Sequence, residues 1–187
     1  MKDLSSHMMD IVQNSIRAEA SWIQIRICED PEADLFLIEI QDNGCGMDEA
    51  TLARVRDPFF TSRTVRKVGL GIPLLQQNAE RTGGKVSIVS QPGQGTTLTA
   101  RFGHSHLDRP PLGDVAETLT LLANPAIHFS YDHSTPSGTY RFDTQEIIQV
   151  LEGVPLGHPE ILPAIQNLIR ENLKEIHADQ SMSIRQS

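Results

Sequence analysis

The sequence has little cysteine, little positive charge and no long apolar run. Its two cysteines, Cys28 and Cys45, are too few for a cysteine metal framework and lack the CxxC spacing of a redox pair. The formal net charge of -8 provides no extended basic surface, so we expect no nucleic-acid binding. No segment approaches the roughly 18 apolar residues that cross a bilayer. The N-terminal residues also lack the apolar core of a secretory signal, so we expect a cytoplasmic protein without membrane contact.

What the chain does contain is typical of a globular protein. Its 187 residues allow one sizeable core, or one domain with a substantial extension, and 39% of them are hydrophobic. The basic residues are unevenly spread, and five of the 16 lie close together: Arg54, Arg56, Arg63, Arg66 and Lys67. Two interpretations stay open for this basic segment, a solvated loop or a local site for phosphate oxygens.

Residues 3–20 have the spacing of an amphipathic helix. The apolar face consists of Leu4, Met8, Ile11 and Val12. A polar stripe on another face consists of His7, Asp10, Asn14 and Arg17. Such a stripe is commonly just the solvent-facing side of a helix, and we interpret His7 as an ordinary member of it.

The remaining elements follow from alternation, helical periodicity and turn residues. Strands are predicted over 22–28 and 35–41, with a strand, a turn at Gly93 and Gly95, and a strand over 85–102. Residues 68–84 predict a glycine loop that leads into a helix, with Pro73 in its first turn. Further helices are predicted over 48–55, 112–123, 144–151 and 159–177, and a hairpin over 126–144.

The segment "DNGCGM" at residues 42–47 is by itself typical of a turn. It belongs, however, to an ordered series: "DIVQNSIRAEAS" (10–21), "DNGCGM" (42–47), "DPFFTSR" (57–63), "GLGIP" (69–73) and "GQGTT" (93–97). In order and spacing the series resembles the N box and glycine boxes of the GHKL ATPases. That superfamily includes gyrase, the heat-shock chaperone, histidine kinases and the mismatch-repair ATPase. The resemblance covers roughly residues 3–103.

The resemblance implies the Bergerat fold, an α/β two-layer sandwich with a mixed, largely antiparallel sheet and helices on one face. Residues 1–104 would form the ATP-binding domain, and residues 105–187 a C-terminal α+β extension of unknown role, whose hairpin could add strands. In that extension, the apolar stripe Ile161, Ile165, Leu168, Ile169 and Leu173 suits a core, a homodimer contact or a partner contact.

The resemblance also implies ATP and Mg²⁺ as ligands. Asp42 would accept the exocyclic amine of adenine, where guanine presents a carbonyl, and Thr96 would complete that contact. Gly44 and Gly46 would let the backbone approach the nucleotide without a Cβ in the way. Asn14 would bind Mg²⁺ together with phosphate oxygens. The remaining nucleotide contacts implied are Arg17, Met47, Phe59, the lid residues Arg66 and Lys67, and the phosphate-binding backbone of Gly69, Leu70 and Gly71.

The sequence pattern indicates the ligand more clearly than it indicates the reaction. Hydrolytic members of the superfamily carry Glu four residues before the N-box Asn, and here that position is Asp10, one methylene shorter. As the candidate general base, Asp10 is compatible with slow hydrolysis or with transfer to a protein side chain.

Three functions stay open. Nine residues precede Asp10, so we expect no dimerising hairpin with a phosphoacceptor histidine in this sequence. We expect a signalling ATPase or a protein kinase that acts on a separate protein, as the anti-sigma-factor serine kinases do. The alternatives are an ATP sensor with little turnover and a structural α/β domain that has lost nucleotide binding, which the intact motif residues disfavour. A mismatch-repair-like ATPase is less favoured because no transducer domain is recognisable.

Overall fold

The computed structural model describes residues 3–56 and 71–178. The helices are α1 (Leu4–Arg17), α2 (Glu49–Arg56), α3 (Gly71–Arg81), α4 (Val115–Leu122), α5 (Thr144–Val150) and α6 (Ile161–Glu175). The strands are β1 (Trp22–Asp30), β2 (Leu35–Asp42), β3 (Lys85–Gln91), β4 (Gly95–Gly103), β5 (His128–Thr135) and β6 (Gly138–Asp143). Within the described ranges, no helix has the length and apolar character needed to cross a membrane.

The strands form one six-stranded mixed sheet in the order β3-β4-β2-β1-β5-β6. Every neighbouring pair is antiparallel except β1 and β5, which are parallel. The alternation along β1 and β2 buries every second residue, as expected for a sheet with one covered face. The predicted α/β sandwich with a mixed, largely antiparallel sheet is therefore confirmed.

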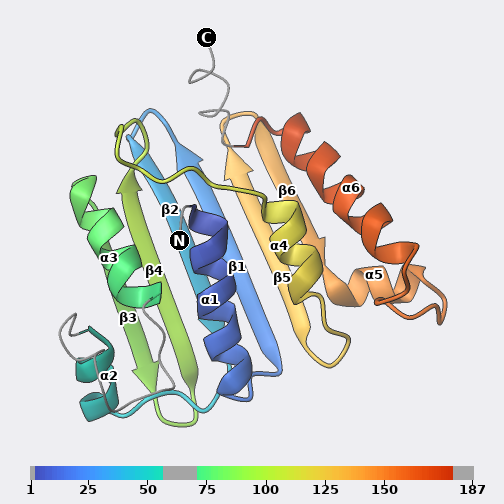
Figure 1. The fold of residues 1–187 in the computed structure, drawn as a ribbon, viewed down its shortest axis with the longest axis horizontal. Helices are drawn as coiled ribbons and strands as arrows, with labels where there is room; N and C mark the ends of the chain where they lie inside the picture. Colours follow the sequence, from blue (N-terminus) through green and yellow to red (C-terminus); the bar gives the residue numbers. More distant parts are fainter. Residues whose placement is uncertain (1–2, 57–70, 179–187) are drawn as a thin grey trace.

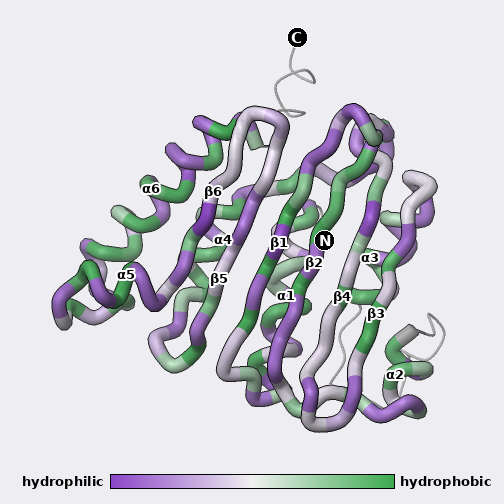
Figure 2. Tube along the Cα trace, turned by 180° about the vertical axis from the view of Figure 1, so that it is seen from behind, coloured by the Kyte–Doolittle hydropathy of each residue, from purple (hydrophilic) through white to green (hydrophobic). Residues whose placement is uncertain are grey.

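Helices α1, α3 and α4 lie side by side over one face of the sheet (Figure 1). Seen from behind, the opposite face carries no helix over β4, β2 and β1 (Figure 2). The core lies between these layers, where Ile25 of β1 and Phe36 of β2 are completely buried in one cluster with Leu4 and Val12 of α1. The apolar face predicted for the first helix is thus the face that packs on the sheet.

Local chemistry determines where α1 begins and ends. The Asp3 side chain caps the helix by accepting from the backbone N–H of Ser6. Ala18 is the C-cap, and Glu19 has a φ of 60°, a left-handed conformation that a helix cannot continue through. The predicted end of this helix at residue 20 was therefore wrong by three residues.

The predicted C-terminal hairpin is β5 and β6, and it extends the same sheet. Residues Trp22 to Cys28 of β1 pair in parallel with His128 to Ser134 of β5. A parallel pairing needs a crossover, and the chain makes it through α4, which packs against α1 and α6. One continuous sheet therefore contains strands from both sides of the predicted boundary between residues 104 and 105. The division into two domains stays a prediction.

Candidate functional site

Four segments with predicted site residues converge at one end of the sheet. The C-terminal half of α1, the loop after β2, the β3–β4 turn and the start of α3 all lie toward the lower end of the view in Figure 1. The predicted residues Phe59, Arg66, Lys67, Gly69 and Leu70 lie outside the described residues. The other predicted site residues can be placed in the structure.

Asp42, the last residue of β2, is 8% exposed and is held by three hydrogen bonds. Its Oδ1 accepts from the backbone N–H groups of Gly44 at 2.9 Å and Thr96 at 3.2 Å. Its Oδ2 accepts from the hydroxyl of Ser15 at 2.6 Å. A carboxylate offers about four lone-pair directions, so one acceptor direction remains for a ligand. The carboxylate is therefore oriented before any ligand binds.

The loop after β2 has a shape that only glycine permits at Gly46. This residue has a φ of 67°, and a Cβ there would lie 1.9 Å from the carbonyl oxygen of Gln91. Backbone hydrogen bonds connect this loop to the end of α1 and to the β3–β4 turn. The Cys45 N–H donates to the Ala18 carbonyl at 2.8 Å, and the Cys45 carbonyl accepts from the Gly93 N–H at 2.7 Å. The thiol of Cys45 is exposed and takes no part in these contacts.

Two serines complete this end of the site, and the sequence analysis missed both. Besides Ser15, the hydroxyl of Ser90 lies 2.9 Å from the Thr96 hydroxyl and accepts from the Met47 N–H at 2.9 Å. Ser90 therefore connects the glycine loop to Thr96, the residue that pairs with Asp42 in the β2–β4 ladder. The pairing of β3 with β4 could have pointed to Ser90, since it lies directly opposite Thr96.

Asn14 and Arg17 lie one turn apart on α1 and contact each other. The Arg17 guanidinium donates to the Asn14 amide oxygen at 2.9 Å, and this oxygen is the atom predicted to bind Mg²⁺. A single amide oxygen is an ordinary protein contribution to a Mg²⁺ site whose other ligands are phosphate oxygens and waters. The donor chemistry therefore fits the ion, provided that Arg17 exchanges its partner for a phosphate oxygen.

Asp10 faces the first residue of α3. A Cβ on Gly71 would lie 1.9 Å from Oδ2 of Asp10, so the close approach of α3 to α1 requires glycine here. Oδ2 itself is buried and has no hydrogen-bond partner among the described residues. An orphaned carboxylate oxygen beside a helix N-terminus is an arrangement suited to handling a proton next to bound phosphate.

His7 is not the solvent-facing residue that the polar stripe predicted. It is 1% exposed and packs between α1 and α3, where its Nε2 lies 3.1 Å from the side-chain nitrogen of Asn78. Burial lowers the pKa of His7 below its usual value, although the Gly71 carbonyl and the Asp10 charge act in the opposite direction. This burial could not be predicted from the sequence, because it depends on where α3 packs.

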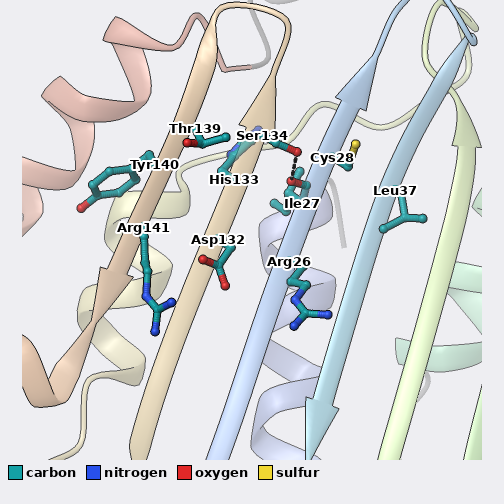
Figure 3. Close-up of a pocket in the computed structure, with 10 residues that line it drawn as sticks. All are labelled: Arg26, Ile27, Cys28, Leu37, Asp132, His133, Ser134, Thr139, Tyr140 and Arg141. Atoms are coloured by element: carbon teal, nitrogen blue, oxygen red, sulfur yellow. Dashed lines mark hydrogen bonds between the residues drawn. The ribbon is translucent and has the colours of Figure 1, made fainter.

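A hollow of about 460 Å³ lies away from this site on the open face of the sheet (Figure 3). Arg26 and Arg141 border it on either side of Asp132, and each arginine already has a carboxylate partner at 3.2 Å, Glu39 and Asp143 respectively. We assign no ligand to this hollow, because its cationic groups are already paired.

Comparison with known proteins adds to this geometry. Residues 2–106 match the family described as histidine kinase-, DNA gyrase B-, and HSP90-like ATPase. A putative sensor protein of Shewanella frigidimarina is 31% identical over 109 residues, 57% of this chain and 17% of that protein. The sensor protein kinase FleS of Pseudomonas aeruginosa is 36% identical over 92 residues, 49% of this chain and 23% of that kinase.

Two further matches extend the comparison. The signal transduction histidine-protein kinase AtoS of Escherichia coli is 34% identical over 97 residues, 51% of this chain and 16% of that kinase. The chain thus spans less than a quarter of the length of these curated relatives. A crystal structure of the N-terminal domain of a DNA repair protein has the same fold, with a TM-score of 0.51 and 21% identity, covering 76% of this chain and 52% of that one.

Proposed function

The chain belongs to the histidine kinase-, DNA gyrase B- and HSP90-like ATPase family, and from that premise we propose that it binds Mg-ATP and transfers the terminal phosphoryl group. The acceptor is water or a side chain of a separate signalling protein. The observation that carries the proposal is the geometry of Asp42, a nearly buried carboxylate fixed by hydrogen bonds from Ser15, Gly44 and Thr96. It lies next to a loop whose conformation requires glycine at Gly46.

Adenine recognition follows from the free acceptor direction of Asp42. An exocyclic amine donates a hydrogen bond and completes the coordination of the carboxylate, whereas the guanine carbonyl at that position would face a second acceptor. The Ser90 hydroxyl donates to the Gly95 carbonyl, so the Thr96 hydroxyl donates to Ser90 and would turn its proton to an adenine ring nitrogen when the nucleotide binds. The short loop from Gly44 to Gly46 supplies backbone against the base.

Phosphate binding is assigned to α1 and the start of α3. Arg17 lies at the exposed end of α1 and exchanges Asn14 for a phosphate oxygen, which releases the Asn14 amide oxygen for Mg²⁺. Bound Mg²⁺ offsets the negative charge of the phosphates. Gly71 opens α3, whose N-terminal N–H groups favour anions. Arg66, Lys67, Gly69 and Leu70 are proposed to join them on the sequence pattern alone, as is Phe59.

Asp10 is the proposed general base. Its carboxylate takes the proton from the attacking hydroxyl, of water or of a protein side chain, as the oxygen–phosphorus bond forms and the ADP oxygen departs. Asp10 is shorter than the glutamate of hydrolytic relatives, and this favours a second candidate function, ATP sensing with little turnover. The names of the matched relatives support a signalling role for either one.

The proposal is tested by titrating purified protein with ATP and ADP, with and without Mg²⁺, and then measuring phosphate release. We expect Mg²⁺-dependent ATP binding, and its absence would remove both candidate functions together. Incubation with labelled ATP and candidate proteins separates a kinase from an ATPase. Asp10→Asn is expected to abolish turnover and to leave ATP binding intact; unchanged turnover would show that Asp10 is not the base.

A further inference from the structure

Two buried polar side-chain atoms have no hydrogen-bond partner among the described residues, and both belong to residues of α1 that lie beside Gly71. One is Nδ1 of His7 and the other is Oδ2 of Asp10. The two residues are three apart on α1, which puts them on the same helix face one turn from each other. Leaving a buried donor or acceptor unpaired costs about 1–3 kcal/mol, so two such atoms one helical turn apart call for an explanation.

The proton of the His7 ring can be assigned from its neighbours. The Asn78 side-chain nitrogen, 3.1 Å away, is a donor, so Nε2 of His7 accepts from it. Burial lowers the pKa of His7 and keeps the ring neutral, so its single proton sits on Nδ1. The Gly71 backbone acts on the ring in the opposite direction to burial, which places this residue of α3 beside His7. His7 therefore presents an N–H donor, and Asp10 presents an acceptor.

Resting on the proposed role of Asp10, we propose that His7 is a positioning residue for phosphoryl transfer. Its Nδ1–H acts on Oδ2 of Asp10 through one bound water, which orients the carboxylate and leaves Oδ1 to accept the proton. A buried water needs two to four polar partners, and here they are the His7 N–H, the Asp10 carboxylate and the Gly71 carbonyl. Oδ2 of Asp10 lies where a Cβ of residue 71 would be, so the carboxylate reaches the backbone of α3 only because this residue is glycine.

The chain offers a matched pair of substitutions. The amide nitrogen of asparagine stands as many bonds from Cα as Nδ1 of histidine, and that of glutamine as many as Nε2. His7→Asn therefore keeps a donor toward Asp10 and gives up the contact with Asn78. His7→Gln keeps a group next to Asn78 and gives up the donor toward Asp10. A purely structural role of His7, exerted through Asn78, predicts the opposite order of effects.

Turnover at saturating ATP is the first readout. We expect His7→Gln to lower kcat roughly 10- to 100-fold, the usual effect of losing a group that orients a reactive residue, with ATP affinity within about twofold of wild type. His7→Asn should stay within about threefold of wild type in kcat. A larger loss in His7→Asn than in His7→Gln, or equal losses in both, would overturn the proposal.

The second readout needs neither ATP nor turnover. A long-range proton–nitrogen correlation spectrum of the full chain should show the His7 ring neutral with its proton on Nδ1. Asp10→Asn should shift that nitrogen signal, while Asp3→Asn, at the start of the same helix, should shift it less. A proton on Nε2, or a signal indifferent to Asp10→Asn, would contradict the positioning role even if the protein turns over ATP. Conversely, a wild-type protein without turnover contradicts the proposed chemistry, and the spectrum still decides whether His7 orients Asp10.

Discussion

At the scale of single residues, Asp42 is the side chain on which nucleotide choice depends. Asp42→Asn keeps an oxygen for the N–H groups of Gly44 and Thr96, so the fold should survive. The new amide nitrogen, however, points a donor at the adenine amine. We expect ATP affinity measured by calorimetry to fall about 100-fold, as for the loss of a hydrogen bond to a charged group. Asp132→Asn, the same change on the open face of the sheet, should leave affinity unchanged; an equal loss there would argue against a specific role for Asp42.

Asn14 should affect the binding of Mg²⁺ and not the recognition of adenine. Asn14→Ala removes the amide oxygen that Arg17 now contacts. We expect ATP affinity in EDTA to stay near that of wild type, while the gain in affinity on adding Mg²⁺ shrinks about tenfold, the low end of the effect of losing a metal ligand's support. Gln13→Ala, the neighbouring amide on α1, is the control. A Mg²⁺ effect that survives in Asn14→Ala would assign the metal elsewhere.

At the scale of elements, the loop after β2 and the β3–β4 turn form one interlocked unit. Gly46 and Gly93 both have positive φ, but a Cβ would strike the Gln91 carbonyl at Gly46 and meet nothing within 4 Å at Gly93. Gly93→Ala should therefore cost only the conformational penalty of about 1 kcal/mol in urea unfolding. Gly46→Ala should cost clearly more and should also weaken ATP binding, because the loop must move. Equal costs would mean that the loop adapts without strain.

At the scale of the whole molecule, a buried polar chain joins the ATPase-like region to the C-terminal hairpin. His133 of β5 is hydrogen-bonded to Glu29 of β1 at 2.7 Å and to the Tyr131 hydroxyl at 2.6 Å. Burial, together with the Glu29 charge, raises the pKa of Tyr131 well above its usual range, so its hydroxyl stays protonated. This polar contact supports the parallel pairing of β1 with β5.

Removing this contact should destabilise both regions together. His133→Ala leaves the Glu29 carboxylate one partner short, so we expect a loss of about 3 kcal/mol in the free energy of unfolding. Ser134→Ala, on the open face of the same strand, should cost far less. Trp22 fluorescence, which reports on β1, and far-ultraviolet circular dichroism should give coincident transitions. Two separate transitions would instead support independent domains divided near residue 104.

The amino-acid sequence alone determined the elements and the family. Alternation, helix periodicity and turn glycines are local properties, so strands such as β1 and β2 and the glycine loop could be predicted from them. Their order along the chain was enough to indicate the superfamily. The roles predicted for Asp42, Asn14 and Asp10 come from that order, and they stay predictions until ligand binding is measured.

Only the tertiary structure decided which side chains support those residues. Ser15 and Ser90 reach Asp42 and Thr96 through packing and strand pairing, and His7 is buried because α3 covers it. The parallel pairing of β1 with β5 joins segments about a hundred residues apart, and no local pattern encodes such a pairing. The physical reason is the same in each case: burial and hydrogen bonding depend on neighbours that are distant in the chain and are brought together only by folding.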